Sequence, residues 1–347
     1  MPRQCDLCGN CRFEIISSHD RRGEELSTEM CLTCGLVSHR HIPSDEELNN
    51  FYTHEYRKLY HGETTPCARR VMRAWKNGER VASRLTPYLP RKAKVLEVGA
   101  GIGCTVKALE RRGFVASGIE PNQGFQRFAA SELGAAVYAA SLSQLTPEIQ
   151  HDVVLLVHVI EHLRSPREAL LHLRECLRPG GLLYVECPNL AAPFALPGRM
   201  FHFAHIYNFT PRTLARLAEQ CGFLVDRRLH DGTNLGLLLR RVEQAPETRA
   251  FADPDAVNEV RDALGRYNWL TYHLRWKYLR HRFATLAECL RERLGAGRFV
   301  RNILAKSGEV VYGATTTFIR LSPPAYSRSN QAAASSRETT ALTNGAT

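Results

Sequence analysis

The sequence contains no apolar run long enough to cross a membrane, since a transmembrane helix needs about 20 predominantly apolar residues. The longest candidate, Val153 to Ile160, is interrupted by His158 and followed by Glu161. The N-terminal residues MPRQCDLCGNC also lack the apolar segment and small-residue cleavage site of a secretory signal. We therefore predict a cytoplasmic protein without a transmembrane segment, whose thiols stay reduced.

Charge is plentiful, with 46 Lys and Arg against 35 Asp and Glu, a formal net charge of +11. Such a balance favours anionic partners, including nucleic acid, phosphorylated metabolites and acidic membrane surfaces, but a solvated basic surface explains it equally well. With 347 residues and 44% hydrophobic content, the chain can bury at least one full core and carry flanking modules.

Four cysteines form two CxxC pairs whose thiolates can turn toward one ion: Cys5, Cys8, Cys31 and Cys34. Gly9 and Gly35 follow the second cysteine of each pair, where a tight turn favours positive φ. This spacing predicts a zinc ribbon over residues 1–42, with a tetrahedral site that has no open position and is therefore structural. Cys11 is a substitute ligand in the same stretch.

The next segment, residues 43–93, is polar and helix-prone and is interpreted as a helical connector. It carries aromatic and histidine side chains at Phe51, Tyr52, His54, Tyr56, Tyr60 and His61. The three tyrosines have two interpretations, as substrate-facing residues or as aromatic packing residues.

Apolar runs and helical patterns alternate from Lys94 onward, which predicts a parallel, doubly wound α/β sheet within a domain spanning 94–242. The pattern predicts strands at 95–98, 114–119, 153–157, 182–187, 223–229 and 235–240 and helices at 105–112 and 123–133. Ser165 and Pro166 predict a helix start, as do Thr210 and Pro211. These two helices are expected to end near Leu177 and at Gly222.

Residues 250–321 are predicted to be mostly helical, after a boundary at Pro246 to Pro254, and residues 322–347 to be a disordered tail. Seven side chains spaced by three and four form one continuous apolar stripe: Trp269, Tyr272, Trp276, Leu279, Phe283, Leu286 and Leu290. Packing on its own domain is the favoured interpretation, and docking on a partner or a membrane surface is the alternative.

The turn from Gly99 to Gly103, reading GAGIG, follows the first strand and starts a helix, so its backbone can approach a nucleotide-like ligand. Glu120 ends the next strand, 21 positions after Gly99, where a carboxylate can accept hydrogen bonds from both ribose hydroxyls. A dinucleotide fold would place its third glycine one position later, where this chain has Cys104, which disfavours an NAD-dependent oxidoreductase.

Four motifs together resemble the class I methyltransferases that use S-adenosylmethionine (SAM): VLEVGAGIG from Val95, GIEP from Gly118, HVIEHLRSP from His158 and LRPGGLLYVECPN from Leu177. The resemblance implies a Rossmann-like sheet of seven strands with the last one antiparallel. It also implies that the first motif contacts the amino-acid half of SAM through Glu97, Gly99, Ala100, Gly101 and Gly103.

By the same resemblance, Glu120, beside Pro121, would hold the ribose, and Ser141 and Leu142 would flank the adenine. His158 would line the methyl-transfer centre. If the acceptor is a hydroxyl or a carbon acid, a base must also remove its proton. The candidate bases lie near the carboxyl ends of strands: His158, Glu161, His162, His205 and Tyr207. His205 is the first choice, because HIYNFTPRTLARLAEQCGF resembles the acceptor-side segment of many small-molecule methyltransferases.

The order of modules, a zinc ribbon followed by a connector and a SAM domain, resembles that of the bacterial sugar C-methyltransferases. We therefore predict a methyltransferase acting on a small molecule, such as a sugar or a cell-envelope or secondary-metabolite precursor. In the alternative, the ribbon and the basic surface bind RNA or protein, although the ribbon's loop mixes Arg21 and Arg22 with Glu24 and Glu25. Neither the acceptor atom nor the oligomeric state follows from the sequence.

Overall fold

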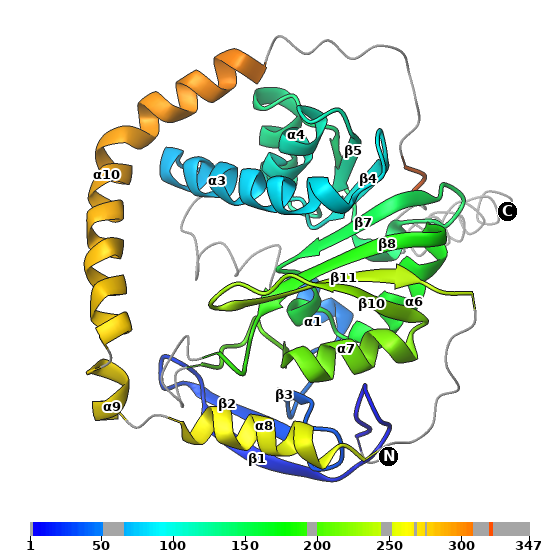
Figure 1. Cartoon of the computed structure of the whole chain (residues 1–347), viewed down its shortest axis with the longest axis vertical. Helices are drawn as coiled ribbons and strands as arrows, with labels where there is room; N and C mark the ends of the chain where they lie inside the picture. The colour runs from blue at the N-terminus through cyan, green and yellow to red at the C-terminus, as the bar shows by residue number, and fades with distance from the viewer. Residues whose placement is uncertain are drawn as a thin grey trace, which may run out of the picture.

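The fold is described from a computed structural model that covers residues 3–50, 66–192, 200–243, 252–266, 269–274, 276–307 and 319–321. Its centre is a seven-stranded sheet in the order β10-β11-β8-β7-β4-β5-β6 (Figure 1). The strands are β4 Lys94–Val98, β5 Val115–Ile119, β6 Val137–Tyr138, β7 His151–Val157, β8 Leu177–Pro188, β10 Phe223–Arg228 and β11 Asn234–Arg241. β11 is antiparallel to both of its neighbours, and the pairs among β4 to β8 are parallel. The predicted Rossmann-like fold with an antiparallel last strand is confirmed.

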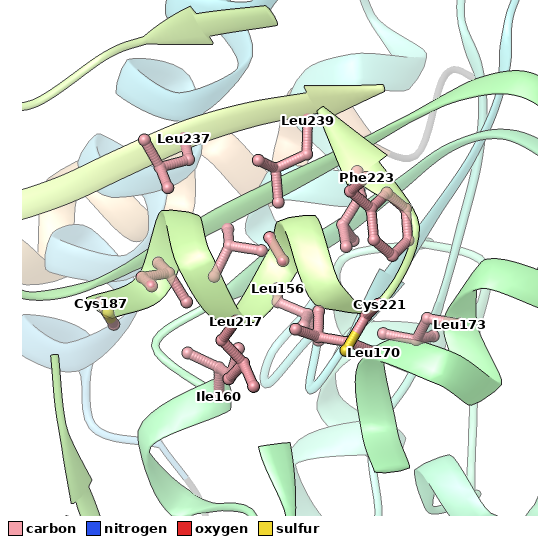
Figure 2. Close-up of a cluster of buried hydrophobic side chains, with 14 of the residues drawn as sticks. Leu156, Ile160, Leu170, Leu173, Cys187, Leu217, Cys221, Phe223, Leu237 and Leu239 are labelled. Atoms are coloured by element: carbon pink, nitrogen blue, oxygen red, sulfur yellow. The ribbon is translucent and has the colours of Figure 1, made fainter. Parts of the chain in front are cut away.

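Helices cover both faces of this sheet, so most side chains of its central strands are buried. α3 Ala68–Leu85 and α4 Cys104–Glu110 belong to one face, and α6 Pro166–Cys176 and α7 Pro211–Gln220 to the other (Figure 1). Successive residues of β7 alternate between the two cores: Val153 and Leu155 pack with α3 and α4, and Val154 and Leu156 pack with α6 and α7. Figure 2 shows the second core, where Leu156, Leu237 and Leu239 of the sheet meet Leu217 of α7.

Both helix starts expected from Ser165 and Thr210 are confirmed. The Ser165 hydroxyl accepts a hydrogen bond from the Glu168 amide at 3.1 Å, and Pro166 occupies the first turn of α6. Thr210 caps α7 by accepting from the Thr213 amide. The two helices that cover this face of the sheet therefore begin where local side-chain chemistry fixes them.

Three predicted boundaries differ from the structure. β8 begins at Leu177 rather than at residue 182, because His151 of β7 already pairs with Leu177 and the Pro-Gly-Gly segment becomes an irregular part of the strand. The helix expected over 123–133 is α5 Gln123–Arg127 followed by a π-helical turn Phe128–Glu132. The first helix of the domain ends at Glu110, two residues before its predicted end at 112.

The N-terminal segment forms a second, four-stranded sheet in the order β1-β2-β3-β9. Its strands are β1 Phe13–His19, β2 Glu25–Cys31, β3 Val37–His39 and β9 Tyr207–Asn208. β9 belongs to the segment after β8, so a strand that follows most of the large sheet in the chain completes the N-terminal sheet. α1 Asp45–Asn50 follows β3.

The C-terminal region returns to the N-terminal sheet before it reaches the large one. α8 Pro254–Gly265 packs on the N-terminal segment, where a Cβ on Gly35 would lie 2.7 Å from the Ala256 carbonyl carbon (Figure 1). α9 Trp269–His273 and α10 Trp276–Ser307 come next, and Ile303 of α10 is part of the α3/α4 core. The apolar stripe therefore crosses a break between two helices, and of its seven side chains only the buried Tyr272 is described.

The aromatic and histidine residues at 51–61 and the tail from 322 onward lie outside the described residues. Among the helices that the structure describes, none combines the length and the apolar character of a membrane span.

Candidate functional site

The glycine turn after β4 borders a cavity of about 250 Å³. Gly99 and Gly101 both have positive φ, at 71° and 55°. A Cβ on Gly99 would lie 2.6 Å from Cγ2 of Val159, whereas a Cβ on Gly101 would meet no atom within 4 Å. Gly99 is therefore required by packing, and the backbone at Gly101 is open to a ligand.

Glu97, the last-but-one residue of β4, lines this cavity and is only 4% exposed. Its Oε2 atom accepts no hydrogen bond from any described residue. Burial raises the pKa of Glu97 to about 8, although a hydrogen bond with Thr105 opposes that shift. A buried carboxylate without a full set of donors is costly, and a cationic group of a ligand would compensate it.

Glu120 comes directly after β5, on the other side of the turn. Its two carboxylate oxygens accept backbone hydrogen bonds, from the Gly101 amide at 2.9 Å and from the Asn122 amide at 2.8 Å. Each carboxylate oxygen can accept more than one hydrogen bond, so Glu120 both fixes the glycine turn and can receive ribose hydroxyls.

Of the other residues predicted to bind SAM, Ala100 and His158 line the cavity, whereas Glu120, Gly103, Pro121, Ser141 and Leu142 lie outside its lining. Gly103 has a packing reason for being glycine, since a Cβ there would lie 2.9 Å from Cβ of Ala135. Pro121 is exposed. Ser141 caps a 3₁₀ turn, in which Leu142 is the first residue, by bonding with Gln144. These positions border β5 and β6, and the structure gives them local roles.

His158, which follows β7, lines the cavity and has a φ of 55°, which is strained for a residue with a side chain. Its Nδ1 atom lies 3.4 Å from Oε1 of Glu161, and its Nε2 atom lies 3.7 Å from Oε1 of Glu186. Burial alone would lower the pKa of His158, but the two carboxylates outweigh burial and raise it above its ordinary value.

Glu161, His162 and His205 come together behind His158, as a cluster whose ligand atoms all lie within 4.8 Å of one another. The ring of His205 is 4.9 Å from that of His162 and 3.9 Å from that of His202, measured between centroids. Burial and these neighbouring imidazoles hold the pKa of His205 far below its usual range. The described residues that line the cavity do not include His205, His162 or Glu161.

Tyr207, the fifth candidate base, is 4% exposed and lies in β9. Its hydroxyl donates to the Arg164 carbonyl at 3.3 Å, and burial raises the pKa of the phenol. This contact gives Tyr207 a structural role at the joint between the two sheets.

The N-terminal sheet holds the histidine-bearing segment in place. The His39 amide donates to the Ile206 carbonyl at 2.9 Å, and the His39 Nε2 atom lies 3.2 Å from the His202 carbonyl oxygen. The Arg21 amide donates to the Phe201 carbonyl at 2.8 Å. The position of His205 relative to the large sheet therefore depends on the N-terminal sheet.

The four predicted zinc ligands meet at the other side of the same ribbon. Sγ of Cys5 lies 3.5 Å from Sγ of Cys34, and Sγ of Cys8 lies 3.6 Å from Sγ of Cys31. Gly9 and Gly35 have φ values of 71° and 72°, as the predicted turns require. Cys11 is exposed and outside this cluster.

A polar network beside the cavity was not predicted from the sequence. Glu186 of β8 is fully buried and pairs with Arg80 and with Arg84, the latter at 3.2 Å, while the Tyr184 hydroxyl donates to it at 2.5 Å. Both arginines also contact Asp231 at 3.2 Å. The charged Glu186 within the apolar strand LLYVECP was the available signal.

The helix α3 adds Arg70 and Asn77 to the lining, and α5 adds Phe125. These residues lie on helices outside the four motifs, so the motif spacings did not predict that they line the cavity. The cavity is thus built partly from the segment interpreted only as a connector.

In the comparison with known proteins, a family model described as a methyltransferase domain matches residues 67–227. An uncharacterised protein of Mycobacterium tuberculosis is 33% identical over 117 residues, 30% of this chain and 39% of that protein. The ubiquinone biosynthesis O-methyltransferase of Aeromonas salmonicida is 27% identical over 154 residues, 38% of this chain and 63% of that enzyme. The tRNA U34 carboxymethyltransferase of Azotobacter vinelandii is 35% identical over 112 residues, 30% of this chain and 35% of that enzyme. The chain thus spans less than two thirds of the length of each relative.

Among solved structures, the 1,6-didemethyltoxoflavin-N1-methyltransferase of Burkholderia thailandensis is 19% identical, with a TM-score of 0.46. The alignment covers 60% of this chain and 96% of that one. The glycine turn, Glu97 and Glu120 all lie within residues 67–227. Residues 67–227, which hold all three of these features, therefore match a methyltransferase domain.

Proposed function

We propose that the whole protein transfers a methyl group from SAM to a small-molecule acceptor. The observation that carries the proposal is Glu97, a buried carboxylate with one unpartnered oxygen in the cavity behind the glycine turn. The ammonium group of SAM is a cation of the size that would pair with this oxygen. We call Glu97, the turn Gly99 to Gly101 and Glu120 the cofactor side of the site.

In this proposal Glu97 binds the ammonium group, the open backbone at Gly101 admits the amino-acid half of SAM, and Glu120 accepts from the ribose hydroxyls. The ring of Phe125 lines the cavity, and we assign it to the adenine. Ser141 and Leu142 stay predicted to flank the adenine. SAM supplies an activated methyl group, and the protein aligns it and excludes water.

The reaction that this arrangement supports is a displacement at the methyl carbon. The acceptor's lone pair forms a bond to the methyl group while the bond from carbon to sulfur breaks, which leaves a neutral thioether. The proton of the acceptor must then leave. We assign the first place in this step to His158, because it lines the cavity, whereas His205 lies behind it. We call Glu161, His162, His202 and His205 the acceptor side.

We further propose that Cys5, Cys8, Cys31 and Cys34 bind a structural zinc ion. Four thiolates at about 2.3 Å from one tetrahedral ion lie about 3.8 Å apart. The sulfur separations of 3.5 and 3.6 Å in the structure are close to that distance. The residues also contact the core of the large sheet, so zinc would stabilise more than the ribbon.

A small-molecule acceptor is favoured by how the ribbon is used. One edge of its sheet pairs with β9, and the second knuckle packs on α8, so both contacts are internal. A sugar or a cell-envelope or secondary-metabolite precursor remains the predicted class. The ubiquinone biosynthesis relative is similar over 38% of this chain, and its name places it in small-molecule metabolism.

An RNA-directed or protein-directed enzyme is the second candidate, favoured by the net charge of +11 and by the similarity to a tRNA U34 carboxymethyltransferase. Binding through phosphates weakens steeply with salt. RNA binding measured at two salt concentrations tests the RNA-directed form: salt-sensitive binding supports it, and no binding at low salt rules it out.

Calorimetry with S-adenosylhomocysteine tests the cofactor side. We expect Glu97→Gln to weaken binding at least tenfold, because a charge-assisted hydrogen bond is lost. Glu79→Gln is the matched control, since Glu79 pairs with Arg112 outside the cavity and its loss should leave the affinity unchanged. Equal affinities for wild type and Glu97→Gln would contradict the assignment.

A further inference from the structure

His158 is the cavity residue whose surroundings the proposed cofactor contacts do not explain. Its side chain lines the cavity and is 38% exposed, and its backbone has a φ of 55°. Its amide donates to the Glu186 carbonyl at 2.8 Å, so β8 holds this backbone in place. A strained backbone beside a cavity persists where the surrounding structure fixes it, often for a functional reason. The groups that contact the ring indicate what that reason is.

Two buried carboxylates flank the ring of His158, and only one of them has its charge compensated by arginine. Glu186, 3.7 Å from Nε2, pairs with both Arg80 and Arg84. Glu161, 3.4 Å from Nδ1, is only 1% exposed, and within the described ranges neither of its oxygens accepts a hydrogen bond. A buried carboxylate without donors is costly. Glu161 therefore gains more from an imidazole N–H than Glu186 does.

His162 is a second imidazole close to Glu161. Its Nε2 atom lies 3.9 Å from Oε1 of Glu161, farther than the Nδ1 atom of His158. Its Nδ1 atom lies 2.6 Å from the Ala204 carbonyl oxygen, which holds the ring toward the segment before β9. His162 is not among the described residues that line the cavity. Of these two imidazoles, His158 is the one placed to exchange a proton with a molecule in the cavity.

We propose that Glu161 is a positioning residue, which holds the Nδ1 hydrogen of His158 toward its own carboxylate and leaves Nε2 as the proton acceptor. An ionised carboxylate only accepts hydrogen bonds, so it selects the tautomer whose N–H faces it. Guanidinium groups offset the charge of Glu186, so Nε2 releases its hydrogen more readily than Nδ1 does. This inference rests on the proposed function for the reaction that the pair serves.

The pair supports methyl transfer to an acceptor that carries a proton, such as a hydroxyl or a carbon acid. The proton moves from the acceptor to Nε2 of His158. The electron pair left on the acceptor forms the bond to the methyl carbon, and the bond from carbon to sulfur breaks with its electrons on sulfur. Glu161 stabilises the imidazolium that forms and does not take the proton itself.

The charged and titratable groups that face His158 come from several elements. Burial lowers the pKa of His158, but Glu161 after β7 and Glu186 in β8 outweigh it, although Arg80 of α3 opposes them. His205, in the segment before β9, adds no positive charge, because burial holds its own pKa far below the usual range. Loss of the Glu161 carboxylate should therefore lower the pKa of His158 as well as release its tautomer.

Nitrogen NMR of the full-length protein with ¹⁵N-labelled histidine tests the orientation of His158. At a pH where this ring is neutral, we expect a protonated Nδ1 and an unprotonated Nε2 in the wild type. The two signals are assigned by their loss in His158→Asn, because asparagine tolerates positive φ. A hydrogen on Nε2 and none on Nδ1 in the wild type overturns the proposal, and this result does not require a folded Glu161 variant.

Glu161→Ala tests the cause of that orientation. The hydrogen should move to Nε2, because Glu186 is then the remaining carboxylate beside the ring, and the pKa of His158 should fall by about one unit or more. Glu168→Ala is the matched control, since Glu168 is exposed on α6, and it should change neither property. A hydrogen that stays on Nδ1 in Glu161→Ala overturns the role of Glu161, whatever happens to the pKa.

Binding of S-adenosylhomocysteine to the wild-type protein separates this inference from the proposed function, because that binding depends on the cofactor side. If the homocysteine product binds and Nδ1 of His158 carries no hydrogen, only the role of Glu161 is wrong. If Nδ1 carries the hydrogen and the product does not bind, the proposed function is wrong and the orientation of His158 by Glu161 stands.

Discussion

The cofactor side and the acceptor side meet at His158, but the chain builds them in different ways. The cofactor side comes from one strand, the turn that follows it and the end of the next strand, all within residues 97–120. The acceptor side takes a 3₁₀ turn after β7, a segment near β9 and support from β3 of the ribbon. Local geometry fixes the first, and long-range strand pairing fixes the second. The predictions below test whether the two sides respond separately.

The largest effect is expected from the ribbon that supports the acceptor side. Cys31→Ser should reduce bound zinc from about one equivalent per chain to near zero, and lower the melting temperature by on the order of 10 °C or more. The reason is that the binding energy of a structural zinc ion is comparable with the whole stability of a domain. Zinc analysis and circular dichroism on the purified protein measure both.

Cys11→Ser is the control for that substitution, because Cys11 is exposed and lies outside the sulfur cluster. It should retain zinc and melt like the wild type. A Cys31→Ser protein with full zinc content and an unchanged melting temperature would remove the ion from the ribbon.

The second largest effect concerns the cofactor side alone. Gly101→Val should reduce S-adenosylhomocysteine affinity by about a hundredfold or more, since a Cβ at Gly101 points into open space that the ligand needs. Gly113→Val is the matched control: its φ of 85° imposes a similar backbone strain, its Cβ also meets nothing within 4 Å, and it lies outside the cavity. Retained binding by Gly101→Val in calorimetry would place the ligand elsewhere.

The contrast between the two sides also explains what the sequence could predict. Short spacings in the sequence identify strand β4, the glycine turn and Glu120. The four cysteines were identified in the same way, so none of these residues required a structure. The approach of His205 to Glu161 depends on β9 joining β3 across most of the chain, and no local pattern encodes that pairing. Sequence therefore identified His205 and Tyr207 as candidates but not their surroundings.

The same reasoning covers the residues that were missed. Arg80 and Arg84 look like ordinary helical surface residues in sequence, and only the packing of α3 on the sheet brings them to Glu186. Their role depends on contacts between elements that are distant along the chain. Glu186 itself was detectable as a charge in an apolar strand, but its partners were not.

A third prediction tests the joint between ribbon and acceptor side through pH. Burial lowers the pKa of His39 to about 4, below the 6.5 of the unfolded chain. The unfolded state therefore binds the proton first, and the stability is complete above about pH 6.5 and is lost as pH falls toward 4. This loss amounts to about 3 kcal/mol for a shift of this size.

Urea unfolding at several pH values should show a smaller slope over this window for His39→Asn than for the wild type. His41→Asn is the control, because His41 is exposed and close by in sequence, and it should keep the wild-type slope. An identical slope in His39→Asn would mean that His39 does not titrate with folding.

The smallest expected effect is the pH dependence of the cofactor side, where the pKa of Glu97 is raised to about 8. Because only the ionised carboxylate pairs with the ammonium group, S-adenosylhomocysteine affinity should fall about fivefold from pH 8 to pH 7 and roughly fiftyfold from pH 8 to pH 6. Between pH 6 and pH 8, ligand binding should release a proton from Glu97. Calorimetry detects this release as a dependence on the ionisation enthalpy of the buffer. In Glu97→Gln both the slope and the proton release should vanish.

The folded protein also holds this proton between about pH 4.5 and 8 while the unfolded chain releases it, so Glu97 opposes folding more strongly as pH rises through that range. Glu97→Gln should therefore bind the ligand less tightly and melt at a higher temperature at pH 8, a combination that a residue with a purely structural role would not produce.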